Sequence, residues 1–256
     1  MTRGPYAEGV LGLPDGVRAC LFDLDGVLTR TAEVHAAAWK ETFDAFLQTW
    51  SSDHHQPFVP FDIVKDYTQY VDGKTRADGV SSFLASRQIS LPDGTPDDPP
   101  SAQTINGIGN RKNELLLQRI QEHGVRAYEG SRRYVEAVRD AGLPRAVVSS
   151  SANTAAVLQA AGLADFFEIR IDGLVVARDG LRGKPAPDTY LAGARALHVE
   201  PSQAAVYEDA LAGVEAGRAG KFGLVVGVNR EDQADALRQH GADIVVSDLA
   251  ELLDPS

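Results

Sequence analysis

The chain has 256 residues, of which 43% are hydrophobic, so it can bury a sizeable core and a wholly disordered chain is excluded. It contains 25 Lys and Arg residues and 36 Asp and Glu residues, which gives a net charge of −11. This negative charge argues against nucleic acid or an anionic membrane as the main partner. The single cysteine, Cys20, excludes an internal disulfide and favours a reducing compartment. Because neither a signal-peptide core nor an apolar stretch of membrane-spanning length is present, we expect a soluble, cytoplasmic protein.

The first predicted element is a buried strand at residues 18–23, and a long insertion follows it. A helix is expected at residues 31–49, because Trp39, Phe43 and Phe46 share one face. The Pro- and Asp-rich residues 92–100 are expected to form a loop, and a second helix is expected at residues 112–123.

After the insertion, apolar runs without alternation predict further strands at residues 145–149, 204–207, 222–228 and 243–246. Helical patterns, several of which end at a glycine, lie at residues 134–141, 154–161, 187–198, 211–219 and 232–240. This alternation predicts an α/β fold with a doubly wound, Rossmann-like parallel sheet. We expect a discontinuous core of residues 16–30 and 125–256, and an inserted helical cap domain of residues 31–124.

The richest motif is LFDLDGVLT at residues 21–29, in which a strand ends in Asp23 and Asp25. Residues two apart on a strand point the same way, so both carboxylates can face one site at the carboxyl end of the strand. Two close carboxylates repel each other, and a metal cation or a shared proton relieves the repulsion. Taken alone, the motif is also compatible with a solvated, Asp-rich turn.

The later motifs make this segment more specific. LFDLDGVLT resembles the first signature of the haloacid dehalogenase superfamily of phosphotransferases, and the other three signatures follow in order. They are a strand ending at Ser149, a lysine at a helix start in Lys184-Pro185-Ala186-Pro187-Asp188, and a strand ending in Glu208 and Asp209. The resemblance implies the HAD fold over essentially the whole chain after about residue 16.

The resemblance also implies a role for each residue. Asp23 would be the nucleophile that forms an aspartyl-phosphate, and Asp25 the general acid and base. A Mg²⁺ ion would be held by the Asp23 carboxylate, the Asp25 carbonyl and Asp209, with Glu208 either a further ligand or a support. Ser149 and Lys184 would contact the transferring phosphoryl group.

The inserted segment resembles the β-phosphoglucomutase family. Thr31, His35 and Trp39 match its first cap helix, where the histidine couples cap closure to the acid/base aspartate, although His35 could simply pack against Trp39. Gly73, Lys74 and Arg76 match its Gly-x-x-Arg loop, in which Arg76 would bind a distal phosphate. An ordinary surface arginine is the alternative for Arg76.

Two further segments match this family, with departures. Lys112 and Asn113 correspond to residues that reach the sugar hydroxyls, or they begin an ordinary charged helix. The core residues Ser151 and Asn153 correspond to the loop at the second phosphate, although Asn153 could also cap a helix. Asp72 and Ala152 stand where the family has lysines.

The leading hypothesis is a Mg²⁺-dependent phosphosugar mutase that interconverts β-D-glucose 1-phosphate and β-D-glucose 6-phosphate through a bisphosphate intermediate. The alternative is a sugar-phosphate phosphatase of the same fold, and a third hypothesis is a non-catalytic binding module. The expected partner is a small phosphorylated sugar, and we expect a monomer rather than an oligomer.

Overall fold

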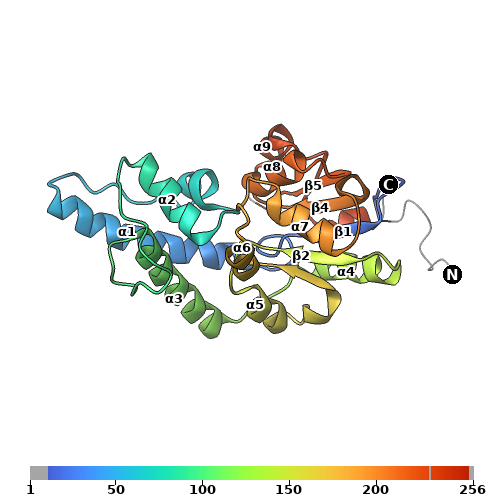
Figure 1. The fold of residues 1–256 in the computed structure, drawn as a ribbon, viewed down its shortest axis with the longest axis horizontal. Coiled ribbons are helices and arrows are strands. Elements are labelled where there is room, and N and C mark those ends of the chain that lie inside the picture. The colour runs from blue at the N-terminus through green and yellow to red at the C-terminus, as the bar shows by residue number, and fades with distance from the viewer. Residues whose placement is uncertain (1–10, 231, 254–256) are drawn as a thin grey trace. The chain divides into compact units, whose positions relative to one another are not determined.

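The computed structural model describes residues 11–230 and 232–253 (Figure 1). Their contacts divide them into two compact units. Unit 1 consists of the described residues up to Arg30 and from Val125 onward, and unit 2 is Thr31–Gly124.

Among the described residues, unit 1 holds a six-stranded sheet in the order β3-β2-β1-β4-β5-β6, and every strand is parallel to its neighbours. The strands are β1 Ala19–Phe22, β2 Arg145–Val148, β3 Ile169–Ile171, β4 Ala204–Glu208, β5 Leu224–Val228 and β6 Ile244–Val246. Phe22 at the end of β1 lies opposite Val147 of β2 and Tyr207 of β4. The carboxyl ends of β1, β2 and β4 therefore meet at one edge.

The helices between these strands pack on the sheet. They are α4 Glu129–Asp140, α5 Thr154–Ala160, α6 Gly173–Asp179, α7 Asp188–Ala196, α8 Leu211–Ala219 and α9 Ala234–His240. Short 3-10 segments lie at Ala164–Phe166, Pro201–Gln203 and Leu249–Leu252. All residues of β1, β2 and β4 are buried, which agrees with strands that are apolar throughout. The predicted fold class is confirmed, although β3 and α6 were not predicted.

Unit 2 is helical, with α1 Ala32–Asp53, a π-helical turn Tyr67–Val71, α2 Arg76–Ser86 and α3 Ile105–His123. Its core centres on Phe43, whose ring centroid lies 5.0 Å from that of Trp39, 5.1 Å from that of Phe61 and 4.2 Å from that of Phe83. The helix expected at residues 112–123 begins at Ile105, and α2 was not predicted. Residues 92–100 contain neither helix nor strand, as predicted.

None of the helices in the described part of the chain is both long and apolar enough to cross a membrane.

Candidate active site

The segment after β1, which we call the catalytic loop (residues 23–29), begins with a buried carboxylate. Asp23 is 7% exposed, and its N–H donates to the Tyr207 carbonyl at 2.9 Å, which extends the pairing of β1 with β4. The chain then turns, because the Leu28 and Thr29 N–H groups both donate to the Leu24 carbonyl at 2.9 Å. This turn keeps Asp23 and Asp25 at the carboxyl end of β1, in unit 1.

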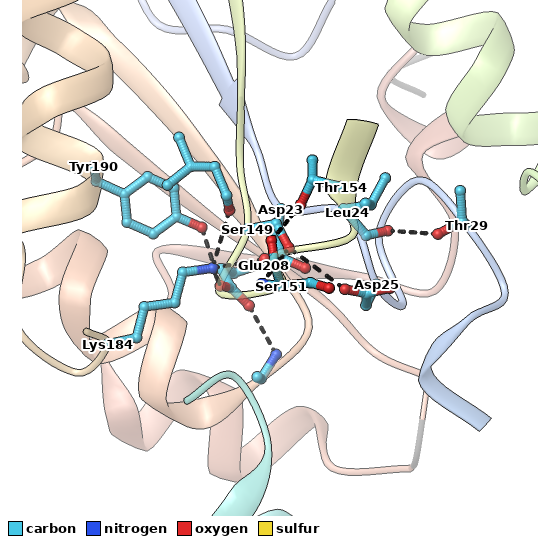
Figure 2. Close-up of polar contacts among 12 residues, drawn as sticks. Asp23, Leu24, Asp25, Thr29, Ser149, Ser151, Thr154, Lys184, Tyr190 and Glu208 are labelled. Carbon is cyan, nitrogen blue, oxygen red and sulfur yellow. Dashed lines mark hydrogen bonds and ion pairs between the residues drawn. The ribbon is translucent and has the colours of Figure 1, made fainter. Parts of the chain in front are cut away.

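Lys184 lies wholly inside this site, just before α7 (Figure 2). Its Nζ donates to Asp23 Oδ1 at 2.6 Å, to Glu208 Oε1 at 2.5 Å and to the Val148 carbonyl at 3.2 Å. Burial alone would lower the pKa of Lys184, but the two carboxylates outweigh that effect and raise the pKa. Lys184 therefore stays charged beside Asp23.

The carboxylate of Glu208 is fully buried, and three donors hold it in place. Its Oε1 accepts from Lys184 and from the Tyr190 hydroxyl at 3.0 Å, and its Oε2 accepts from the Ala210 N–H at 3.0 Å. Gly213 of α8 packs so closely that a Cβ there would lie 1.7 Å from Glu208 Oε1. This arrangement favours the supporting role of Glu208 over that of a metal ligand.

The carboxylates of this site suit a hard divalent cation. Ligand oxygens of Asp23, Glu208 and Asp209 lie within 4.8 Å of one another, and all three residues are buried. Burial raises the pKa of Asp23; Lys184 opposes this increase, and the Glu208 and Asp25 carboxylates add to it. Four carboxylates, those of Asp23, Asp25, Glu208 and Asp209, lie around the Lys184 ammonium. This excess of negative charge suits Mg²⁺, which prefers carboxylate oxygens, and Asp23 and Asp209 offer them.

The loop after β2 brings hydroxyl groups to the same edge of the sheet (Figure 2). Ser149 Oγ donates to Asp25 Oδ2 at 3.5 Å and accepts from the Ser151 N–H at 3.1 Å. The Ser151 Oγ in turn accepts from the Asn153 N–H at 3.2 Å. Ser149 thus reaches the catalytic loop, whereas Ser151 and Asn153 shape the turn before α5.

In unit 2, the structure brings three of the predicted residues together. Lys112 Nζ on α3 lies 3.1 Å from His35 Nδ1 on α1 and 4.9 Å from the centre of the Trp39 ring. Lys112 and Trp39 are each 4% exposed, and Trp39 belongs to the core of this unit. The His35 N–H donates to the Thr31 carbonyl at 2.9 Å within the first turn of the helix. Asn113 follows Lys112 on α3.

The predicted Gly-x-x-Arg loop leads into α2. Gly73 has a φ of +72°, and Lys74 Nζ donates to Ser82 Oγ at 2.8 Å. The aliphatic part of the Arg76 side chain lies against Gly109 of α3. A Cβ added at Gly109 would lie 3.1 Å from the Arg76 Cγ. Burial lowers the pKa of Arg76, and no carboxylate of the described residues forms an ion pair with it.

One residue of this network was not found from the sequence. Tyr190 of α7 is fully buried, and its ring lies 4.9 Å from Lys184 Nζ. It follows the lysine motif by only two positions, but a tyrosine on the buried face of a helix is an ordinary core residue. Only the geometry reveals that its hydroxyl donates to the partner of Lys184.

The comparisons with known proteins agree with this architecture. Residues 17–221 match the family of haloacid dehalogenase-like hydrolases. A β-phosphoglucomutase of Mycobacterium bovis is 58% identical over 95% of this chain and 94% of its own length. A validoxylamine A 7'-phosphate phosphatase of Streptomyces hygroscopicus is 31% identical over 93% of this chain and 97% of its own length.

The solved structures include a β-phosphoglucomutase from Clostridium difficile with a TM-score of 0.72 and 24% identity, covering 92% of this chain and 93% of that one. This likeness supports the fold. The family match and the 58% identity show that this chain is an enzyme of the haloacid dehalogenase-like hydrolase family, in its β-phosphoglucomutase-like branch.

Proposed function

We propose that this enzyme is a phosphosugar mutase that interconverts β-D-glucose 1-phosphate and β-D-glucose 6-phosphate. The observation that carries the proposal is the 58% identity to a β-phosphoglucomutase over 95% of the chain, which covers unit 2 as well as the acids of unit 1. In this proposal unit 1 is the catalytic core and unit 2 is the cap that recognises the sugar.

Asp23 is the proposed nucleophile. A lone pair of its carboxylate forms a bond to phosphorus, and the bond between phosphorus and the donor's oxygen breaks. Asp25 gives a proton to the leaving oxygen and later takes the proton from the attacking sugar hydroxyl. Transfer from phospho-Asp23 to the free hydroxyl of a bound monophosphate gives the bisphosphate and restores the Asp23 carboxylate. Transfer of the other phosphoryl group of the bisphosphate back to Asp23 then leaves the second monophosphate.

Mg²⁺ is the proposed cofactor, held by the Asp23 carboxylate, the Asp25 main-chain carbonyl and Asp209. When bound, the ion would neutralise negative charge on the transferring phosphoryl group. Glu208 supports the site by holding Lys184, and the Lys184 ammonium contributes a second positive charge beside Asp23.

The cap residues are assigned to the sugar and its distal phosphate. Arg76 would bind that phosphate through its planar guanidinium, and Ser151 and Asn153 of the core would contact it as well. Lys112 and Asn113 would contact the sugar hydroxyls. Thr31, His35, Trp39, Gly73 and Lys74 would shape the cap side of the site.

The test is an assay with β-D-glucose 1-phosphate, Mg²⁺ and a trace of the bisphosphate, in which glucose 6-phosphate and free phosphate are followed separately. Formation of glucose 6-phosphate well in excess of free phosphate supports the mutase. Free phosphate without glucose 6-phosphate would identify a phosphatase instead.

A phosphatase is the second candidate, and two observations favour it. The validoxylamine A 7'-phosphate phosphatase matches nearly the whole chain at 31% identity. In addition, Asp72 and Ala152 stand where the β-phosphoglucomutase family has lysines, so the distal site carries less positive charge than the family pattern. A phosphatase uses water as the acceptor and needs no second phosphate site.

A further inference from the structure

Arg230, two residues after β5, contacts the catalytic loop although more than 200 positions separate Arg230 from Gly26. Its Nε donates to the Gly26 carbonyl at 2.8 Å, and its Nη1 donates to the Ser247 carbonyl at 2.8 Å. Nη1 also lies 3.6 Å from Asp248 Oδ2, and the side chain is only 13% exposed. A planar guanidinium can serve two carbonyl groups at once, so its position is well fixed.

Gly26 lies between two of the proposed Mg²⁺-binding positions. It directly follows Asp25, and a Cβ on it would lie 1.7 Å from Asp209 Oδ2. Its N–H donates to the Thr29 carbonyl at 2.8 Å, and its carbonyl accepts from Arg230. A shift of Gly26 would therefore move the peptide next to Asp25 and also change the space beside the Asp209 carboxylate.

The ring of Tyr128 supports Arg230 from the side. The centre of the Arg230 guanidinium lies 3.6 Å from the ring centroid, the range of a cation–π contact. The guanidinium of Arg30 lies 4.9 Å from the same ring. Tyr128 is itself tied to the catalytic loop, because its N–H donates to the Leu28 carbonyl at 3.0 Å.

Gln233, three residues after Arg230, contacts the main chain at Asp209, which directly follows β4. Gln233 Nε2 donates to the Asp209 carbonyl at 3.0 Å, and the Gln233 N–H donates to Asn229 Oδ1 at 2.7 Å. Two side chains that follow β5, Arg230 and Gln233, thus hold the main-chain carbonyls of Gly26 and Asp209.

We propose that Arg230 is a positioning residue for phosphoryl transfer: by holding the Gly26 carbonyl, it keeps the Asp25 peptide and the Asp209 carboxylate in the geometry that Mg²⁺ binding requires. Gln233 has the same role toward the main chain of Asp209. This inference rests on the proposed Mg²⁺-dependent chemistry at Asp23, on which Arg230 acts through the Gly26 carbonyl.

The experiment compares Arg230→Gln with the control variant Arg145→Gln. This control also removes a buried arginine, but at the amino end of the strands, opposite the acidic residues. Arg145 has a side chain that is 8% exposed, and it also donates to main-chain carbonyls, those of Phe166 and Leu143. For each variant, Mg²⁺ binding is measured by calorimetry, stability by thermal unfolding, and phosphoryl transfer with acetyl phosphate.

We expect Arg230→Gln to weaken Mg²⁺ binding and to lower kcat by roughly 10–100-fold each, as is usual when a supporting contact of a metal site is lost. The KM for acetyl phosphate at saturating Mg²⁺ should change much less, and Arg230→Lys should recover only part of the loss. Arg145→Gln should lower the unfolding temperature but leave Mg²⁺ affinity unchanged. Equal Mg²⁺ affinity in both variants would overturn the proposal.

If Arg230→Gln does not fold, Gln233→Ala provides the same test, because Gln233 is partly exposed and its side chain donates to the Asp209 carbonyl. It should weaken Mg²⁺ binding several-fold, and unchanged binding would contradict the inference. Acetyl phosphate separates this result from the proposed function: a wild-type enzyme that turns it over but makes no glucose 6-phosphate refutes the mutase and leaves the Arg230 comparison intact.

Discussion

Asp23 and Asp25 are two residues apart, yet their surroundings differ. Asp23 is buried against the Lys184 ammonium at 2.6 Å, whereas Asp25 is partly exposed and accepts a long hydrogen bond of 3.5 Å from Ser149. Burial raises the pKa of Asp23, and the Lys184 ammonium opposes this increase, as a cation beside the carboxylate favours the ionised, nucleophilic form. A less enclosed carboxyl group at Asp25 can exchange a proton with substrate oxygens, so the environments agree with the proposed division of roles.

The first prediction concerns Asp25→Asn. This variant keeps the main-chain carbonyl that is proposed to bind Mg²⁺, but its side chain cannot transfer a proton. Mg²⁺ and substrate binding should persist while turnover falls by about 100-fold or more. Calorimetry and steady-state kinetics measure the two effects. Asp23→Ala serves as the contrast, since it should also abolish phosphoenzyme formation; near-normal turnover of Asp25→Asn would refute the proton-transfer role.

Gly26→Ala is the second prediction. Gly26 has a φ of +90°, and an added Cβ would lie 1.7 Å from Asp209 Oδ2, so the Asp209 carboxylate must move. We expect at least about tenfold weaker Mg²⁺ binding, measured by calorimetry. Gly142→Ala is the control, because Gly142 has a φ of +74° with nothing within 4 Å of the added Cβ. It should cost about 1 kcal/mol of stability without changing Mg²⁺ affinity.

At the scale of elements, the predictable parts were those with a strong local pattern. The apolar runs that became β1, β2 and β4 are buried on both faces, and α1 carries its aromatic residues at helical spacing. β3 was missed because its middle residue, Arg170, is charged and exposed at the sheet edge, so β3 is not a continuous apolar run. α2 was missed because Gly79, Ser81 and Ser82 weaken its pattern.

In the candidate site, too, the residues that could be predicted are those that lie in a local sequence motif. The acids were found because a strand that ends in Asp-x-Asp is a local signal, and Lys184 because it lies in a compact motif. Tyr190 and Arg230 were not found, since a helical tyrosine and a loop arginine carry no motif of their own. Their relation to Glu208 and Gly26 arises only when the sheet brings distant segments together.

The start of α3 provides the third prediction. Thr104 Oγ1 accepts from the Gly107 N–H at 2.9 Å and donates to Asp98 Oδ2 at 2.6 Å, so it both caps the helix and holds the preceding loop. Thr104→Ala should lower the free energy of unfolding by about 1 kcal/mol, measured by denaturant titration. Thr104→Ser keeps the hydroxyl and should retain most of the stability; an equal loss in both variants would show that the methyl group is responsible.

At the scale of the whole molecule, the two units carry separable parts of the proposed reaction. The acids, Ser149 and Lys184 belong to unit 1, whereas Arg76, Lys112 and His35 belong to unit 2. Any enzyme of this family that transfers a phosphoryl group to Asp23 needs the first set. Only an enzyme that binds a bisphosphate in either of two orientations also needs a second phosphate site, and this requirement distinguishes a mutase from a phosphatase.

The last prediction uses that difference through Arg76→Ala. The loss of one charge-assisted contact to a phosphate weakens binding by roughly 10–150-fold. We therefore expect the rate of the mutase reaction to decrease by a factor in this range. Phosphoryl transfer from acetyl phosphate should change far less, because that donor occupies only the site at Asp23. Arg119→Ala is the control, since Arg119 pairs with Glu41 at the surface of the same unit at 2.7 Å and should leave both activities unchanged. If Arg76→Ala reduces both activities equally, Arg76 acts on the fold or on the first phosphate site and is not the distal clamp that a mutase requires.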